Sequence, residues 1–189
     1  MSTCSDCKVH MGRTCCELPA GETPTFGVTY PEAIRASKAS GVPVSKCFTV
    51  ESLTKEEYAD FIKKSEVFSK IFTKGLRVRL NVIPDGPGNS CCVFLKKGEG
   101  CSLPKDSRPH VCRLYPFWFE ASVSKGGNAL GITIVNNLFS GPCYGKLLAK
   151  SGELLSLFNT DIDSLKSVAS QLLVDAEAHA VMVKSKLRR

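Results

Sequence analysis

Residues 76–88 read LRVRLNVIPDGPG and decide the fold class. Apolar residues alternate with polar or charged ones from Leu76 to Val82, which is the period of a β-strand with one buried face. The PDGPG run at 84–88 is rich in the residues that form tight turns. The pattern therefore predicts a half-buried strand at 76–83 that ends in a turn.

Three further strands are expected, separated by segments that contain glycine. They lie at 91–96, 115–123 and 130–136, and the last two are joined as a hairpin through Gly126, Gly127 and Asn128. Such short strands, separated by turns and without regular strand–helix alternation, favour an antiparallel arrangement over a parallel doubly wound sheet.

Helices are predicted where a capping pattern precedes helical periodicity. Thr29 and Glu32 start a helix that ends before Gly41, and Thr54 and Glu57 start a second helix that runs through residue 72 and ends at Gly75. A long helix begins near Thr160, with Asp163 completing the pattern, and its apolar stripe is read as core packing. The stripe consists of Ile162, Leu165, Ala169, Leu172 and Ala176.

The expected architecture is α+β, with helices packed around one small antiparallel sheet and a cysteine-ligated metal site. Residues 1–145 form the cysteine-cluster domain, and residues 146–189 form a helical extension packed on the same domain.

Ten cysteines in 189 residues need an explanation, because a chain of this length can bury a core without disulfides or metal. The first residues, MSTCSDCKVHMGRTCC, lack the apolar run of a signal peptide, and no stretch is apolar and long enough for a membrane span. We therefore expect a cytoplasmic protein without membrane contact. In that compartment clustered cysteines are better read as metal ligands than as disulfides.

The net charge of +7 is a weaker signal. Basic residues are scattered, and only the terminal KSKLRR forms a run, so they indicate a solvated surface. A zinc module that binds nucleic acid is a remote alternative, since paired CxxC knuckles and aromatics interleaved with basic residues are both missing.

Most cysteines fall into an N-terminal block at residues 4–16 and a mid-chain block at residues 91–112. We expect the two blocks to meet in space, because a site made from one block alone would leave the clustering of the other unexplained. Cys4 and Cys7 form a CxxC pair in a loop-like segment, residues 1–28, that we expect metal to hold in place. A thioredoxin-like role for this pair is disfavoured, because no strand precedes it. In the vicinal pairs at 15–16 and 91–92 one thiol can reach a given metal easily, while the other packs as a small apolar group or reaches a second centre.

The order of these motifs resembles the YkgJ-type family of small zinc- or iron-chelating proteins with a CxxCxxxCC motif. The most specific stretch is RPHVCRLYPFW at 108–118, with the CxFL element matched by CVFL at 92–95 and a late CxG element similar to GPCYG at 141–145. The resemblance spans residues 4–143. The segment 8–14 departs from it by separating Cys7 from Cys15 more widely than the family does.

The resemblance implies a set of metal ligands and leaves Cys47 and Cys91 outside it. A distant similarity to flagellin lysine methylases, which are associated with an iron–sulfur cluster, makes iron a competitor of zinc. Tetrahedral thiolates suit both, so the cofactor is either an iron–sulfur cluster, such as a [4Fe–4S] cluster, or Zn²⁺. The implied ligands are Cys4, Cys7, Cys15, Cys16, Cys92, Cys101, Cys112 and Cys143.

Residues near Cys112 suggest supporting roles. Arg108 and Arg113 could donate to its sulfur, or they could be exposed loop residues. Residues 116–119 are read as an apolar wall that keeps water from the site. His10 and His110 are minor candidates as nitrogen ligands, and His179 is assigned to the surface of the terminal helix.

These observations predict a metal-binding protein that serves a protein partner as a structural, electron-transfer or modification accessory factor. An alternative is an iron–sulfur redox enzyme or a methylase-like component of protein modification. The sequence speaks against an enzyme, because it shows no glycine-rich nucleotide loop and no catalytic triad or paired carboxylates.

Overall fold

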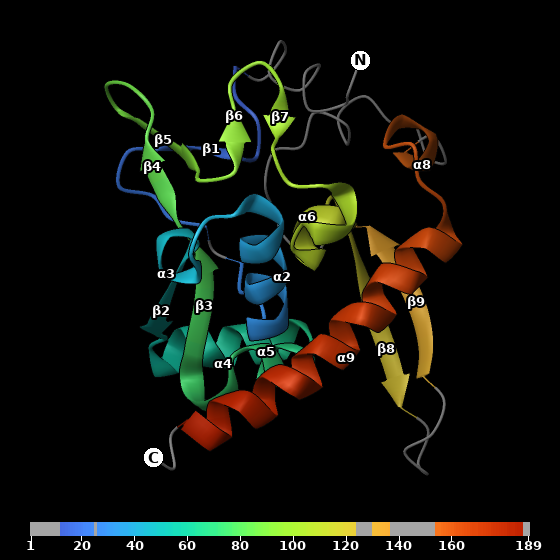
Figure 1. Cartoon of the computed structure of the whole chain (residues 1–189). Coiled ribbons are helices and arrows are strands. Elements are labelled where there is room, and N and C mark those ends of the chain that lie inside the picture. The colour runs from blue at the N-terminus through green and yellow to red at the C-terminus, as the bar shows by residue number, and fades with distance from the viewer. Residues whose placement is uncertain (1–11, 25, 124–129, 137–153, 187–189) are drawn as a thin grey trace.

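The computed structural model describes residues 12–24, 26–123, 130–136 and 154–186 (Figure 1). In these ranges the chain is α+β, with small antiparallel sheets and several helices, which confirms the expected fold class. Within the described part of the chain, no helix combines the length and the apolar character needed to cross a membrane.

The strands of the described ranges form four separate small sheets, so the prediction of a single sheet is wrong. One sheet has three strands in the order β1 (Glu17–Pro19), β5 (Asn89–Cys92) and β4 (Val82–Pro84). The others are antiparallel pairs: β2 (Phe48–Ser52) with β3 (Leu76–Leu80), β6 (Leu95–Lys96) with β7 (Gly100–Cys101), and β8 (Phe117–Val123) with β9 (Leu130–Asn136).

Asn81 divides the strand that was predicted at 76–83. Its side chain accepts from Thr49 Oγ1 and donates to the Lys46 carbonyl, and its backbone N–H donates to the Cys47 carbonyl. These bonds attach residue 81 to the start of β2, so β3 stops there and β4 continues towards β5. The predicted strand at 91–96 likewise divides into β5 and β6, because Phe94 between them turns into the core.

The two N-terminal capping boxes are confirmed. Thr29 caps α2 (Tyr30–Ser40), which ends at Gly41 with a φ of 72°, a left-handed conformation that glycine adopts without strain. Thr54 caps α4 (Lys55–Lys64). The short helix α3 (Val44–Cys47) leads from α2 into β2.

The helix predicted at 54–72 is in fact broken at Ser65, whose backbone is extended. The exposed helix α4 ends there, and α5 (Phe68–Ile71) and the 3₁₀ turn η1 (Thr73–Gly75) follow. The break has a packing reason, since α4 buries no side chain whereas α5 buries Phe68 and Ile71.

The long helix α9 (Ile162–Lys186) runs past α6 (His110–Leu114), α2 and α5 and contacts β9 (Figure 1). It follows the short helix α8 (Leu154–Leu157). Its cap is Asp161, not Thr160, because the Asp161 carboxylate accepts from the Ser164 N–H at 2.7 Å.

The stripe on α9 is core packing as expected, with one exception. Leu165, Ala169, Leu172 and Ala176 are buried, whereas Ile162 is exposed. They belong to the α9 core, which contains Val67, Phe68, Ile71, Phe72, Leu114, Phe117, Trp118, Phe119, Leu165, Val168, Ala169, Leu172 and Ala176.

His179 corrects the sequence reading, since it is fully buried and not on the surface. Its Nδ1 accepts from the backbone N–H of Tyr30 at 3.0 Å, which satisfies a donor in the first turn of α2. A second core, the β2–β3 core, lies under α2 and contains Val28, Ala33, Ala36, Cys47, Phe48, Val78, Leu80, Phe94 and Leu103.

Candidate metal centre

Pairing of β1 with β5 brings an N-terminal cysteine to the middle cysteines. The backbone N–H of Cys92 donates to the Cys16 carbonyl at 2.7 Å, and Glu17 lies opposite Cys91 in the sheet. The two blocks therefore meet in space at residues 16 and 92, as their clustering in sequence predicted.

The β6–β7 hairpin places a third cysteine nearby. Cys101 pairs with Leu95, and the Ser102 N–H donates to the Phe94 carbonyl at 2.8 Å. Cys92 and Cys101 both pack against the β2–β3 core, which contains their near neighbours in sequence Phe94 and Leu103. The β2–β3 core therefore supports both cysteines, Cys92 at the end of β5 and Cys101 in β7.

The fourth cysteine, Cys112, lies in the middle of α6, and a buried carboxylate fixes the start of that helix. Glu32 is 2% exposed, and its Oε1 accepts from the His110 N–H at 2.6 Å. Its Oε2 accepts from the N–H and the hydroxyl of Thr29, at 2.6 and 2.7 Å. The Glu32 side chain therefore both completes the cap of α2 and fixes the start of α6.

We expect Glu32→Gln to destabilise the fold by about 2 kcal/mol, because the new amide group turns a donor towards a buried N–H or hydroxyl that needs an acceptor. Chemical denaturation measures the loss. Glu57→Gln is the matched control, since Glu57 makes the same capping box on the exposed helix α4 and should cost about 0.5 kcal/mol or less. Equal losses in the two variants would contradict the bridging role of Glu32.

The thiols influence one another electrostatically. The pKa of Cys112 is raised well above its ordinary value, first by loss of water around the sulfur and then by the charges of Cys16, Cys92 and Cys101. Part of the surface of Cys112 is exposed to solvent, but its sulfur atom is surrounded by protein atoms. Burial is the largest cause that raises the pKa of Cys92, to about 11. A hydrogen bond from the Phe94 backbone lowers this pKa by less, and the charge of Cys101 raises it further. An arrangement of this kind disfavours thiolates until a cation is present.

The other predicted ligands divide into two sets. Cys15 lies in the exposed loop before β1, and Cys4, Cys7 and Cys143 lie outside the described residues. Among the residues that the structure describes, no group of three or more His, Cys, Asp or Glu side chains is arranged to hold a metal ion. The structure therefore shows neighbouring thiols but no complete metal site.

Cys47 and Cys91, which the resemblance leaves outside the ligand set, are both buried. The Cys47 thiol donates to the Val42 carbonyl at 3.7 Å and packs in the β2–β3 core. Burial is the first cause that raises its pKa. Cys47 is therefore a structural residue of that core.

The residues around Cys112 have other partners than those expected. Arg108 Nε donates to the Leu103 carbonyl at 3.0 Å, and Arg113 Nη1 donates to Gln171 at 2.9 Å, so the hydrogen bonds seen do not lead to the Cys112 sulfur. His110 Nε2 is bound to Asp175, and its buried Nδ1 has no hydrogen-bond partner among the described residues. His10 lies outside the described residues.

The apolar residues after α6 also differ from the expectation. Phe117, Trp118 and Phe119 pack in the α9 core, where Trp118 stacks on Phe68 with ring centroids 5.4 Å apart. They support the fold and do not form a wall dedicated to the cysteines. Pro116 is buried beside them.

Comparisons with protein-family models, with curated proteins and with solved structures gave no match.

Proposed function

We propose that the protein binds an iron–sulfur cluster or Zn²⁺ through cysteine thiolates and serves a protein partner in the cytoplasm as a structural, electron-transfer or modification factor. The observation that carries this proposal is the electrostatic coupling of Cys112 with Cys16, Cys92 and Cys101. The four cysteines come from three separated segments, which the backbone bond between Cys92 and Cys16 and the packing of Cys92 and Cys101 on one core bring together. The charges of the other three raise the pKa of Cys112, which is unfavourable for a thiolate unless a cation compensates.

The donor set fits a soft metal. Sulfur ligands in groups of four suit both Zn²⁺ and iron–sulfur clusters, and neither needs an additional nitrogen or oxygen ligand. Cys16, Cys92, Cys101 and Cys112 are the proposed ligands among the described residues, where no three of them are already arranged around one point, so binding would also draw their segments together. Cys4, Cys7, Cys15 and Cys143 would be further ligands or members of a second site. When bound, zinc would hold the segments together, whereas an iron–sulfur cluster would also allow electron transfer.

The chain's own residues supply the rest of the proposed arrangement. Glu32 fixes the start of α6, and the β2–β3 core supports Cys92 and Cys101. Because these supports pack independently of the thiols, most of the molecule should stay folded when the metal is removed.

Replacing one proposed ligand should release the metal, whereas replacing a core cysteine should not. We expect Cys112→Ala to lose most of its bound zinc or iron after anaerobic purification, since a tetrahedral site then lacks a ligand. Cys47→Ala is the control, because Cys47 is a buried cysteine outside the proposed set. Metal analysis measures both, and a brown protein would identify iron where a colourless zinc protein would identify zinc. Full metal content in Cys112→Ala would contradict the assignment of this ligand.

Chelation should loosen one part of the molecule selectively. Amide hydrogen exchange is expected to become faster in residues 1–28 and 91–116, whose segments the metal would join, and to stay slow in α9, which is held by the α9 core. Loss of protection throughout the chain would mean that metal nucleates the whole fold. Unchanged protection everywhere would mean that the cysteines are not ligands.

A further inference from the structure

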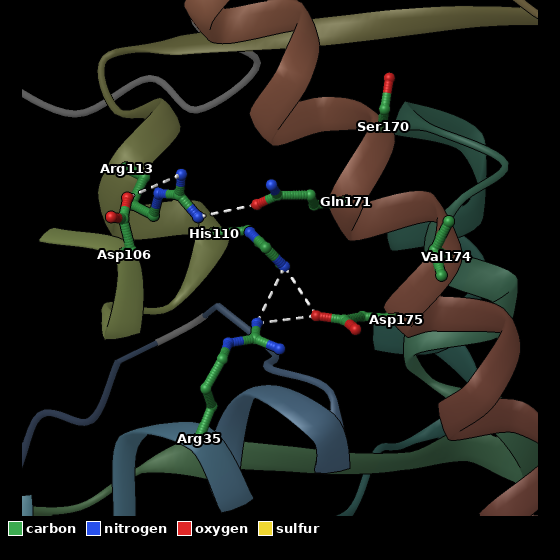
Figure 2. Close-up of a pocket in the computed structure, with 8 residues that line it drawn as sticks. All are labelled: Arg35, Asp106, His110, Arg113, Ser170, Gln171, Val174 and Asp175. Atoms are coloured by element: carbon green, nitrogen blue, oxygen red, sulfur yellow. Dashed lines mark hydrogen bonds and ion pairs between the residues drawn. The ribbon is translucent and has the colours of Figure 1, made fainter. Parts of the chain in front are cut away.

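A pocket with a volume of about 460 Å³ lies between α2, α6 and α9, and none of the described cysteines lines it (Figure 2). Charged side chains line it together with the apolar Val174 of α9. The residues that matter are Arg35, Asp106, His110, Arg113, Val174 and Asp175. His110 and Arg113 come from α6, the helix that also carries Cys112.

Arg35, His110 and Asp175 form one hydrogen-bonded group, in which the buried His110 Nδ1 has no partner among the described residues. Asp175 Oδ2 accepts from Arg35 Nη2 and from His110 Nε2, both at 2.8 Å. Because an ionised carboxylate only accepts, His110 Nε2 carries the hydrogen in this assignment. Arg35 Nη2 lies 3.2 Å from His110 Nε2. Because both atoms are then donors, they do not form a hydrogen bond with each other. The charges of Arg35 and Asp175 cancel within this group.

Arg113 is satisfied much less completely. Its side chain is only 10% exposed, yet the carboxylate that pairs with it in the described part of the chain is Asp106, which is 92% exposed and 3.5 Å from Nη2. Nη1 donates to the neutral amide oxygen of Gln171. The buried Nε has no hydrogen-bond partner among the residues described. A nearly buried guanidinium thus has an unfilled donor and a weakly held counter-ion.

The geometry of this guanidinium matches one kind of ligand. Gln171 and Asp106 lie on opposite sides of it (Figure 2), so the edge formed by Nη2 and the buried, unpaired Nε is on the side of the exposed Asp106 side chain. A carboxylate binds such an edge with two parallel hydrogen bonds, which is the strongest pairing available to arginine. An exposed ion pair at 3.5 Å competes weakly with it.

We propose that this pocket binds a carboxylate carried on a short aliphatic chain, with the carboxylate on the Nε–Nη2 edge of Arg113 in place of Asp106. Val174 is 69% exposed and lines the same pocket, so it offers an apolar contact to the chain of the ligand. The carboxylate can come from a free organic acid or from a glutamate side chain of a protein. The proposal is independent of the metal centre.

The test follows the Nε–H resonance of Arg113 in the metal-loaded protein while sodium butyrate is added, with sodium chloride at equal ionic strength as the reference. A saturable shift with butyrate and none with chloride is expected. N-acetyl-glutamate amide is titrated in parallel: tighter binding than butyrate assigns a protein side chain as the source, and weaker binding assigns a free acid. Inorganic phosphate binding as tightly as butyrate would overturn the carboxylate assignment.

Three variants complete the test. Asp106→Asn removes the competing carboxylate and should tighten butyrate binding about two- to fivefold. Arg113→Lys removes the two-donor edge and should weaken it at least about tenfold. Arg108→Lys is the matched control, since Arg108 also lies near Cys112 but bonds the Leu103 carbonyl, and it should leave butyrate binding unchanged. The proposal would be overturned if butyrate binding did not saturate in the wild type, or if it were unchanged in Arg113→Lys. Metal content is measured on the same samples, so that failure of this site can be distinguished from failure of the metal centre.

Discussion

Acidification from pH 6.5 to pH 4 should cost the wild-type protein about 3 kcal/mol more stability than a variant in which His179 is replaced by asparagine. His179 is fully buried, and loss of water around its ring lowers the pKa to about 4, against a smaller opposing effect of the Ile71 backbone. Nε2 of His179 makes no hydrogen bond of normal geometry in the described chain. The Ile71 backbone therefore offsets only a small part of the fall in pKa that burial causes.

The direction follows from proton counting. Between the ordinary pKa of histidine near 6.5 and the folded value of about 4, the unfolded chain binds a proton that the folded protein excludes. The stabilisation is therefore complete above the ordinary pKa and is lost as the pH falls towards the folded value. His179→Asn keeps an acceptor for the Tyr30 N–H but removes the titrating ring, so its stability should fall less steeply.

Denaturant unfolding at intervals between pH 4 and pH 7 measures this difference. Metal release and protonation of carboxylates affect both proteins alike, so the comparison isolates the histidine. Parallel stability curves for the wild type and His179→Asn would show that the ring is protonated in the folded state and would contradict the prediction.

Gly27→Ala should be the most damaging small substitution in the N-terminal segment. A Cβ at residue 27 would lie 2.1 Å from Phe72 Cε1 and 3.0 Å from Ile71 Cγ2, and both residues are buried in the α9 core. Phe72 cannot move aside easily, because it stacks on Phe68 at a centroid distance of 5.4 Å and touches Phe61. We expect a loss of about 3 kcal/mol or a failure to fold.

The control for this prediction is a rescue. Phe72→Leu removes the aromatic atoms that the new methyl group meets, so the double variant should be more stable than the sum of the two single losses predicts. Thermal unfolding of the four proteins gives the coupling. Additive losses would mean that Gly27 does not contact Phe72 closely in solution.

Features encoded locally could be predicted from the sequence, and those that depend on distant partners could not. The capping boxes at Thr29 and Thr54 were read correctly, because each box is formed within four residues. The single sheet was wrong in part because the short strand β2, with the sequence FTVES, was not recognised, although it pairs with β3 along five residues. The hairpin of β8 and β9 was predicted, since its glycine-rich connection is local.

The candidate site divides in the same way. The meeting of the N-terminal and mid-chain cysteine blocks was predicted from their clustering, and the backbone bond between Cys92 and Cys16 confirms it for these two residues. Glu32 was read only as a capping residue, although its second oxygen also holds the His110 N–H. That contact spans 78 positions of sequence and has no local signal. His179 was misassigned for the same reason, as its partner is the backbone of Tyr30.

The support of α6 by α9 has a consequence for the order of events during synthesis. The thiols of the proposed centre come from residues 16, 92, 101 and 112, but the helix that carries Cys112 is bound to Asp175 and Gln171 of α9. A growing chain emerges from the ribosome N-terminus first, so Cys112 is available well before α9 can hold its helix in place. We therefore expect nascent chains that stop before residue 162 to bind metal loosely and to exchange it readily, and stable loading to begin only when α9 has been made.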